Sequence, residues 1–316
     1  MKKAGVIDIG SNTIKLLVAS DEGGKLNPLH TSIEECRISK GISRDRPILL
    51  PEAMDRGLAA VQNLIGIARE RGVSKIHIVA TSAVRDAANG RAFADIIRHR
   101  CDHEVEILTG QQEAEAIAFG LSFDPAVVGT HDFYHFDLGG GSLEFNEIRQ
   151  GDLHRAISMP LGAVRLTEMF VDQPHQPMKA EEQEAIQKHV VQTLEAQGIA
   201  TPPHDLPLIF TGGSVAVARS LISDKPIADP SPESAQIFLS QLESLYRKLS
   251  PIPYEERLRF NYLPPNRADV VCAAILVLTS LISYCKKSFF QHSLFALRHG
   301  IAAKTLGLRP FRKGFC

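Results

Sequence analysis

Two similar stretches organise this chain: "VIDIGSNTIKLLVAS" at residues 6–20 and "FDLGGGSLEFNEI" at residues 136–148. Each stretch ends an apolar strand with an aspartate, continues with a turn of glycine and small polar residues, and enters a second alternating strand. Asp8 of the first stretch corresponds to Asp137 of the second. Alternating strands joined by such turns are typical of β-hairpins. The sequence therefore predicts an internal duplication, with one hairpin of the same plan in each half.

Between and after the hairpins, short alternating segments take turns with segments that have helical spacing. The stretches 51–71 and 179–197 carry apolar residues at helical intervals. Thr109 and Gln112 have the spacing of a capping box, which predicts a helix that begins at Thr109. Strands that alternate with helices in both halves indicate the α/β class.

Composition and net charge argue against nucleic-acid and membrane partners for this chain. The chain has 316 residues, 44% hydrophobic residues and a formal net charge of −1, so no global charge attracts nucleic acid or a membrane surface. Its five cysteines form no CxxC pair, which is typical of a reduced cytoplasmic protein. The apolar run from Val270 to Ile282 is short for a bilayer and predicts a buried helix. We expect a cytoplasmic protein without membrane or nucleic-acid partners. A homodimer is left open.

The turns of the two hairpins have the chemistry of a phosphate site. Glycines let backbone N–H groups approach a ligand, and successive N–H groups form concavities that bind oxyanions. The sequence contains neither a GxxxxGK[ST] loop nor a GxGxxG motif between a strand and a helix. The simpler interpretation is two ordinary turns, each with a capping aspartate. The candidate phosphate-binding residues are Gly10, Ser11, Asn12 and Thr13 in the first turn, and Gly139, Gly140, Gly141 and Ser142 in the second.

Carboxylates next to these anion pockets predict a divalent cation. A carboxylate and a phosphate repel each other unless a hard cation such as Mg²⁺ binds the oxygens of both. Asp8, Asp137 and Glu144 are the candidate ligands of Mg²⁺ or another divalent cation. Glu144 alternates with Leu143 and Phe145, so a solvent-facing strand residue is the competing interpretation.

Six segments, taken in order, resemble the exopolyphosphatase / guanosine pentaphosphate phosphatase (Ppx/GppA) family of the actin-like ATPase superfamily. They are "DIGSNTIKLLV", "ATSAVRDAANG", "LTGQQEAEAIAFG", "DLGGGSLEF", "MPLGAVRLTEMF" and "TGGSVAVA". The resemblance extends over nearly the whole chain and implies the short form of the family, without the additional C-terminal helical domain. It implies an α/β fold of two ribonuclease-H-like domains with an interdomain cleft. The implied boundaries are residues 1–122 plus 301–316 for the first domain and 123–300 for the second.

The resemblance also implies roles for several residues. Glu113 matches the second acid of the family's paired glutamates and would be the general base. Arg85, just past a strand end, would bind phosphate, and Gly212 and Gly213 of "TGGSVAVA" would contact the phosphate chain. The residues alone favour a helix-terminal carboxylate stabilised by the helix dipole for Glu113, and only the resemblance reverses this preference. Arg85 could pair with Asp86 or Glu113.

The implied function is a phosphoanhydride hydrolase. It would release the terminal phosphate of inorganic polyphosphate, of guanosine pentaphosphate, or of both, by Mg²⁺-assisted in-line attack of water. A small-molecule kinase of the same superfamily is one alternative. A catalytically weak alarmone-binding regulator is another, because Gln112 replaces the first family glutamate and Glu115 stands where the family commonly has arginine.

Other charged residues carry weaker hypotheses. The His-Asp pairs at 131–132 and 204–205 lack the helical context of a metal dyad, and we do not expect them to bind metal. With a net charge of −1, a site for a long polyanion must collect its own cations. The candidates for such a basic track, beyond Arg85, are Arg37, Lys40, Arg267, Lys286, Lys287, Arg298 and His299.

Overall fold

The computed structural model describes residues 2–127, 129–227 and 235–309. The chain divides into two compact units. The first comprises residues 1–131, 144–158 and 295–316, and the second comprises residues 132–143 and 159–294. The boundary expected between residues 122 and 123, and the interdomain cleft, stay predictions.

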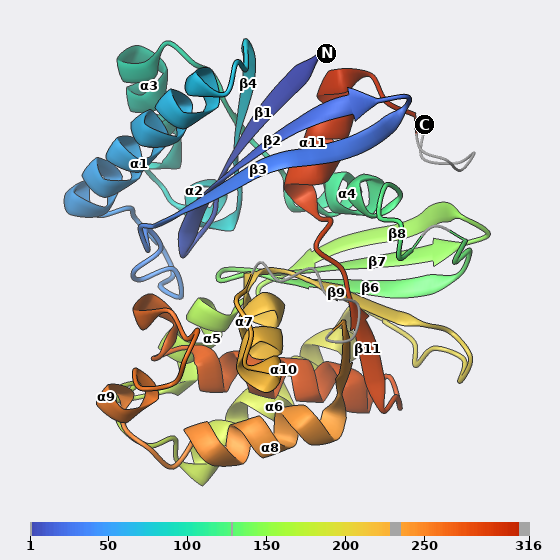
Figure 1. Cartoon of the computed structure of the whole chain (residues 1–316). Coiled ribbons are helices and arrows are strands. Elements are labelled where there is room, and N and C mark those ends of the chain that lie inside the picture. Colours follow the sequence, from blue (N-terminus) through green and yellow to red (C-terminus); the bar gives the residue numbers. More distant parts are fainter. Residues whose placement is uncertain (1, 128, 228–234, 310–316) are drawn as a thin grey trace. The chain divides into compact units, whose positions relative to one another are not determined.

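A five-stranded sheet forms the centre of the first unit, in the order β3-β2-β1-β4-β5 (Figure 1). Its strands are β1 (Lys3–Ile9), β2 (Thr13–Glu22), β3 (Lys25–Glu35), β4 (Lys75–Ala80) and β5 (Val105–Ile107). The first three strands are antiparallel, whereas β4 runs parallel to β1 and β5 parallel to β4. The predicted first hairpin is β1 and β2, with Asp8 opposite Lys15.

Helices cover both faces of this sheet, as an α/β fold requires. They are α1 (Pro51–Glu70), α2 (Ser82–Asp86), α3 (Gly90–Cys101), α4 (Gly110–Leu121) and α11 (Leu297–Leu306). Successive residues of a strand face opposite sides. Gly5 of β1 faces Ala68 of α1, while Ala4 and Val6 share a core with Ala302 of α11. Helix α11 thus packs on this sheet through Ala302 and Ala303. The assignment of residues 301–316 to the first domain stays a prediction, and residues 310–316 lie outside the described residues.

Two glycines bring α4 and α11 into backbone contact. A Cβ on Gly300 would lie 1.9 Å from the carbonyl oxygen of Ala116, and a Cβ on Gly120 would lie 2.4 Å from that of Ala296. Only glycine permits this approach at either position. The contact fixes α4, whose first turn carries Glu113.

The second sheet has six strands in the order β10-β11-β9-β6-β7-β8. They are β6 (Phe133–Leu138), β7 (Leu143–Arg149), β8 (Asp152–Met159), β9 (Leu208–Thr211), β10 (Gln236–Phe238) and β11 (Phe289–His292). β6 and β7 are the strands predicted for the second hairpin. Within the second unit, Phe210 stacks on Phe290 with ring centroids 4.1 Å apart and meets Phe136 edge-on at 5.3 Å, which builds the aromatic core of β6, β9 and β11.

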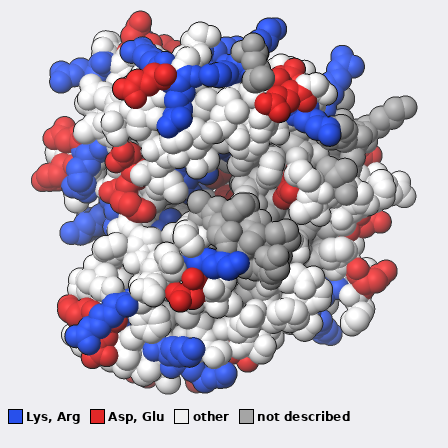
Figure 2. Space-filling model, in the orientation of Figure 1, with Lys and Arg blue, Asp and Glu red and all other residues white. Residues whose placement is uncertain are grey.

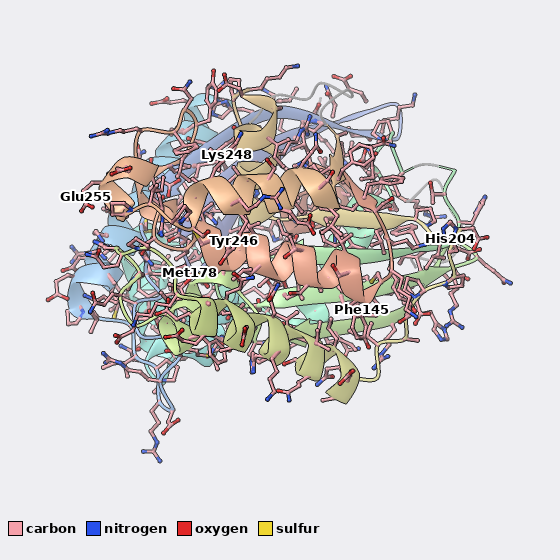
Figure 3. The ribbon with its side chains drawn as sticks, turned by 90° about the horizontal axis from the view of Figure 1, so that it is seen from below. Phe145, Met178, His204, Tyr246, Lys248 and Glu255 are labelled. Atoms are coloured by element: carbon pink, nitrogen blue, oxygen red, sulfur yellow. The ribbon has the colours of Figure 1, made fainter. Side chains whose placement is uncertain are left out.

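A helical layer completes the second unit. It contains α5 (Ala163–Phe170), α6 (Ala180–Ala196), α7 (Gly213–Ser223), α8 (Leu239–Leu249), α9 (Tyr254–Arg257), a 3-10 helix (Pro265–Arg267) and α10 (Val271–Tyr284). Helix α10 lies between α6 and α8 (Figure 3). Across this layer, the Tyr246 hydroxyl of α8 donates a hydrogen bond to the Met178 sulfur at 3.2 Å.

The predicted buried helix is confirmed as α10, whose residues Val271–Ile282 are all buried. No helix in the described ranges has the length and apolar character needed to cross a membrane. Cys36, Cys101, Cys272 and Cys285 are free thiols, and Cys316 lies outside the described residues.

Candidate active site

The first turn is closed by its own backbone and held by a neighbouring segment. The Gly10 N–H donates to the Thr13 carbonyl at 3.2 Å. After β3, the chain returns, and the N–H groups of Arg37 and Ser39 donate to the carbonyls of Asn12 and Ser11 at 2.9 and 3.2 Å. Arg37 takes a left-handed conformation, with φ of 42°, to make this return. The candidate phosphate-binding residues of the first unit thus form one fixed loop.

The second turn repeats this closure. The Gly139 N–H donates to the Ser142 carbonyl at 3.1 Å, as Gly10 does to Thr13. Helix α5 begins directly on the turn, because the Val164 N–H donates to the Gly140 carbonyl at 2.8 Å. A Cβ on Gly162 would lie 2.4 Å from the Gly140 oxygen, so the close approach needs glycine. The sequence repeat is therefore also a repeat of backbone geometry.

Glu113 is buried in the first turn of α4 and bonded to Arg85. Its side chain accepts a hydrogen bond from Arg85 Nη1 to Oε2 at 2.7 Å, and the residue is 6% exposed. The predicted capping box is confirmed, and its hydrogen bonds are made by Thr109 and Gln112. The cap therefore does not use the side chain of Glu113. Arg85 also lies 3.4 Å from Asp86. Both ion pairs considered for Arg85 from the sequence are present.

Opposing effects act on the carboxyl of Glu113. Burial raises its pKa well above the usual range, and the neighbouring charge of Glu144 raises it further. The Arg85 guanidinium lowers the pKa, and the charge of Asp8 adds a smaller increase. The net result is a carboxyl whose pKa lies well above that of an ordinary glutamate. A raised pKa of this kind is typical of carboxyls that exchange protons near neutral pH.

Glu144 lies inside the structure, with 2% of its surface exposed, so the interpretation as a solvent-facing strand residue is wrong. The alternation along β7 misled here, because both faces of this strand are covered. Ser158 of β8 donates a hydrogen bond to Glu144 Oε1 at 2.8 Å. A Cβ on Gly110 would lie only 2.5 Å from the Ser158 Cβ. Ser158 thus links Glu144 to the start of the helix that carries Glu113.

Asp8 has a buried carboxylate oxygen without a described hydrogen-bond partner. Its Oδ1 is buried, and no hydrogen bond reaches this atom from the described residues. Burial raises the pKa of Asp8, while the charges of Lys15 and Arg298 lower it. A buried polar atom without a partner is costly, and a bound cation would satisfy this oxygen. The donor set of Asp8 and Glu144 therefore fits a hard cation such as Mg²⁺, which uses one or two carboxylates and keeps several waters.

In the second unit, Asp137 is the second-last residue of β6, close to the turn of residues 139–142. Thr211 Oγ1 donates to Asp137 Oδ2 at 2.6 Å, and His135 Nε2 lies 2.8 Å from the same hydroxyl. Burial lowers the pKa of His135 to about 3, so its ring is neutral. Gly212 adjoins Asp137, and Gly213 begins α7.

The sequence-predicted residues therefore fall into two groups. The first unit brings together Asp8, Arg85, Glu113 and Glu144 beside the turn of residues 10–13. The second unit brings Asp137 together with Gly212 beside the turn of residues 139–142. Reasoning from the sequence missed Ser158, Thr211 and His135. The only sequence signal for these partners is the presence of glycine at positions 110 and 212, where another segment comes too close for a side chain.

The two departures from the family pattern both have local explanations. Gln112 accepts from the Thr109 N–H at 2.8 Å, so this glutamine completes the capping box as a glutamate would. Glu115 accepts a hydrogen bond from Gln111 at 2.8 Å along the helix surface. Among the contacts described, neither side chain bonds Glu113.

The basic track contains two residues that cannot serve as predicted. His299 is buried, its pKa is lowered to about 3, and its Nδ1 accepts the Ala296 N–H. Arg267 is also buried, at 7% exposure. On the face shown in Figure 2, Lys and Arg are interspersed with Asp and Glu. Within the described residues, no group of three or more His, Cys, Asp or Glu side chains is arranged to hold a metal.

Comparison with known proteins identifies the fold and the family of this chain. The paired glycine-lined hairpins, each on an α/β sheet, define a protein of two actin-like domains. Residues 17–308 match the model of the Ppx/GppA phosphatase family. The chain belongs to this family, as the resemblance predicted.

Three similar proteins illustrate the relationship. Exopolyphosphatase 2 of Mycobacterium tuberculosis is 27% identical over 298 residues, which cover 89% of this chain and 90% of that protein. The crystal structure of an exopolyphosphatase from Cytophaga hutchinsonii has a TM-score of 0.84 and 25% identity, and covers 98% of this chain and 99% of its own. An uncharacterized protein of Streptomyces coelicolor is 32% identical over 195 residues, so the match spans 60% of this chain and 55% of that relative.

Proposed function

We propose that this member of the Ppx/GppA phosphatase family hydrolyses the terminal phosphoanhydride bond of inorganic polyphosphate, of guanosine pentaphosphate, or of both. The observation that carries the proposal is the environment of Glu113, a buried carboxyl with a raised pKa bonded to an arginine. The names of its exopolyphosphatase relatives support the same reaction class.

Glu113 is the proposed general base. A base works best when its pKa lies near the working pH, because it then accepts a proton readily and is still largely deprotonated. Burial and Glu144 raise the pKa of Glu113, while Arg85 favours its charged form. In the proposed step, Glu113 orients the attacking water and takes its proton. The capping box of α4 holds the first turn of the helix, and with it the carboxyl, in a fixed orientation.

Arg85 and the two turns are the proposed phosphate ligands. A guanidinium offers several donors to phosphate oxygens. Gly140 and Gly141 carry backbone N–H groups for this role, and Ser11, Thr13 and Ser142 carry hydroxyls. The N–H groups of Gly10 and Gly139 instead close their own turns. Gly212 and Gly213 are proposed to approach the same phosphate chain.

Asp8, Asp137 and Glu144 are the proposed carboxylates for Mg²⁺. The bound ion would neutralise charge on the transferring phosphoryl group. The chain's own contribution is to hold these carboxylates buried and oriented, through Ser158 for Glu144 and through Thr211 for Asp137.

A phosphate-release assay tests the proposal. Inorganic polyphosphate, guanosine pentaphosphate and ATP are compared side by side, with and without Mg²⁺. We expect Mg²⁺-dependent release from at least one of the first two substrates. Transfer of the ATP phosphate to an acceptor would favour the kinase, and binding of guanosine pentaphosphate without release would favour the regulator.

A further inference from the structure

Three side chains of the second unit form a hydrogen-bonded row below the second turn. His135 and Asp137 are two residues apart on β6, so they project from the same face of the sheet. β9 runs parallel to β6, with Thr211 in register with Asp137. His135 and Thr211 are both 0% exposed, and Asp137 is 8% exposed. All three residues of the row are therefore sheltered from water.

Donor and acceptor chemistry gives this row a direction. An ionised carboxylate only accepts hydrogen bonds, so the Thr211 hydroxyl must donate its single proton to Asp137 Oδ2, at 2.6 Å. The Thr211 oxygen can then meet His135 only as an acceptor. The 2.8 Å contact with Nε2 consequently requires that this ring nitrogen carry a proton. The order of donation is His135 to Thr211 to Asp137.

The chain supports Asp137 from a second side as well. Directly after Thr211, Gly212 has φ of 106°, a conformation that side chains rarely allow. A Cβ at Gly212 would lie 2.8 Å from Asp137 Oδ1 and 2.5 Å from the Leu138 carbonyl oxygen. A side chain at position 212 would therefore collide with one carboxylate oxygen of Asp137, while Thr211 bonds the other.

We propose that Thr211, oriented by His135, is a positioning residue that holds the Asp137 carboxylate in one orientation next to the turn of residues 139–142. This inference rests on the proposed function, because Asp137 is there a ligand for Mg²⁺. Groups that hydrogen-bond a ligating carboxylate fix its orientation, and their loss typically costs ~10–100-fold in metal affinity.

The test compares three threonine variants of the full chain. Thr211→Val keeps the shape and removes the hydroxyl, whereas Thr211→Ser keeps the hydroxyl. Thr279→Val is the matched control, because Thr279 is a buried threonine of α10 whose hydroxyl bonds only the Leu276 carbonyl among the contacts described. Circular dichroism first establishes that each variant is folded at the assay temperature.

The first readout is Mg²⁺ binding by calorimetry in the absence of any phosphate substrate. Thr211→Val is expected to weaken the affinity at least tenfold, and Thr211→Ser and Thr279→Val to stay within threefold of the original chain. Equal affinities for Thr211→Val and the original chain would overturn the positioning role. Complete lack of Mg²⁺ binding by the original chain would overturn it too, together with the proposed cofactor.

The second readout is independent of function. Ring ¹⁵N NMR of the original chain is expected to show His135 with a proton on Nε2, and this signal is expected to change in Thr211→Val. A proton on Nδ1 alone would overturn the proposed row, whatever the enzyme does. A chain that binds Mg²⁺ with the expected order of affinities but releases no phosphate would contradict the proposed function and still support the role of Thr211.

Discussion

Arg85 and Glu113 form a partly buried ion pair, with Arg85 Nη1 2.7 Å from Glu113 Oε2. The two residues follow neighbouring strands, since β4 precedes the helix of Arg85 and β5 precedes the helix of Glu113, and these strands are parallel. Ligand sites in α/β sheets form at the carboxyl ends of such strands. The pair therefore lies at the edge of the sheet where ligand sites form in this architecture, and Arg85 favours the charged form of the proposed base.

Removal of the Arg85 charge is expected to move the pH profile of phosphate release. Arg85 lowers the pKa of Glu113, so Arg85→Gln should raise that pKa. A base must be deprotonated to act, and the acid limb of kcat/KM should therefore move to higher pH. Arg85→Lys, which keeps a positive charge, is the control and should move the limb less. An acid limb that stays in place in Arg85→Gln would contradict the coupling.

Glu113 is also expected to reduce the stability of the folded chain near neutral pH. Its pKa is higher in the folded state than the ordinary glutamate value of the unfolded chain, so the folded state binds more protons between the two values. Stability from this group is thus present at low pH and is lost as pH rises through the folded pKa. Chemical denaturation should find Glu113→Gln more stable than the original chain at pH 8, with a smaller difference at pH 5. The opposite trend with pH would contradict the raised pKa.

A reciprocal swap separates packing from hydrogen bonding at Ser158. Gly110→Ala alone should lose about 1–3 kcal/mol of stability, because its Cβ would collide with the Ser158 Cβ. In the double variant with Ser158→Gly, the colliding Cβ is absent, and urea denaturation should recover most of that loss. Phosphate release should nevertheless stay at least tenfold low, since Glu144 lacks its hydroxyl donor. Full activity in the stable double variant would show that Ser158 only fills space.

The contact between α4 and α11 predicts a large effect at a single glycine. The Cβ of Gly300→Ala would lie 1.9 Å from a backbone oxygen, which cannot move aside as a side chain can. We expect a loss of about 3 kcal/mol or more in denaturant unfolding. Gly66→Ala in α1 is the control, because nothing lies within 4 Å of its Cβ. It should gain up to about 1 kcal/mol from helix propensity, and equal effects at both sites would contradict the close contact.

Local patterns predicted much of the fold. The two hairpins, the capping box of α4 and the buried helix α10 each follow from residues that are neighbours in the sequence. β3 was not predicted, because Pro28 and many exposed residues weaken its alternation.

Partners distant in the sequence could not be predicted. Thr211 and Asp137 are 74 residues apart, and Ser158 and Glu144 are 14 apart. No local pattern joins them, because the sheet registers that bring them together form only in the folded chain. Burial of His299 was missed as well, and helix α11, which carries it, packs against α4, β1 and β2.

The proposed role of Glu113 as general base is tested most directly by phosphate release from Glu113→Gln, measured beside Glu115→Gln on the same helix. Both changes neutralise one glutamate, but Glu115 bonds only Gln111 among the contacts described and has no proposed role in the reaction. We expect Glu113→Gln to bind polyphosphate within threefold of the original chain while turnover falls ~10²–10⁴-fold, the typical contribution of a positioned base. Glu115→Gln should release phosphate at the original rate. Turnover by Glu113→Gln within threefold of the original chain would contradict the assignment of Glu113 as the base.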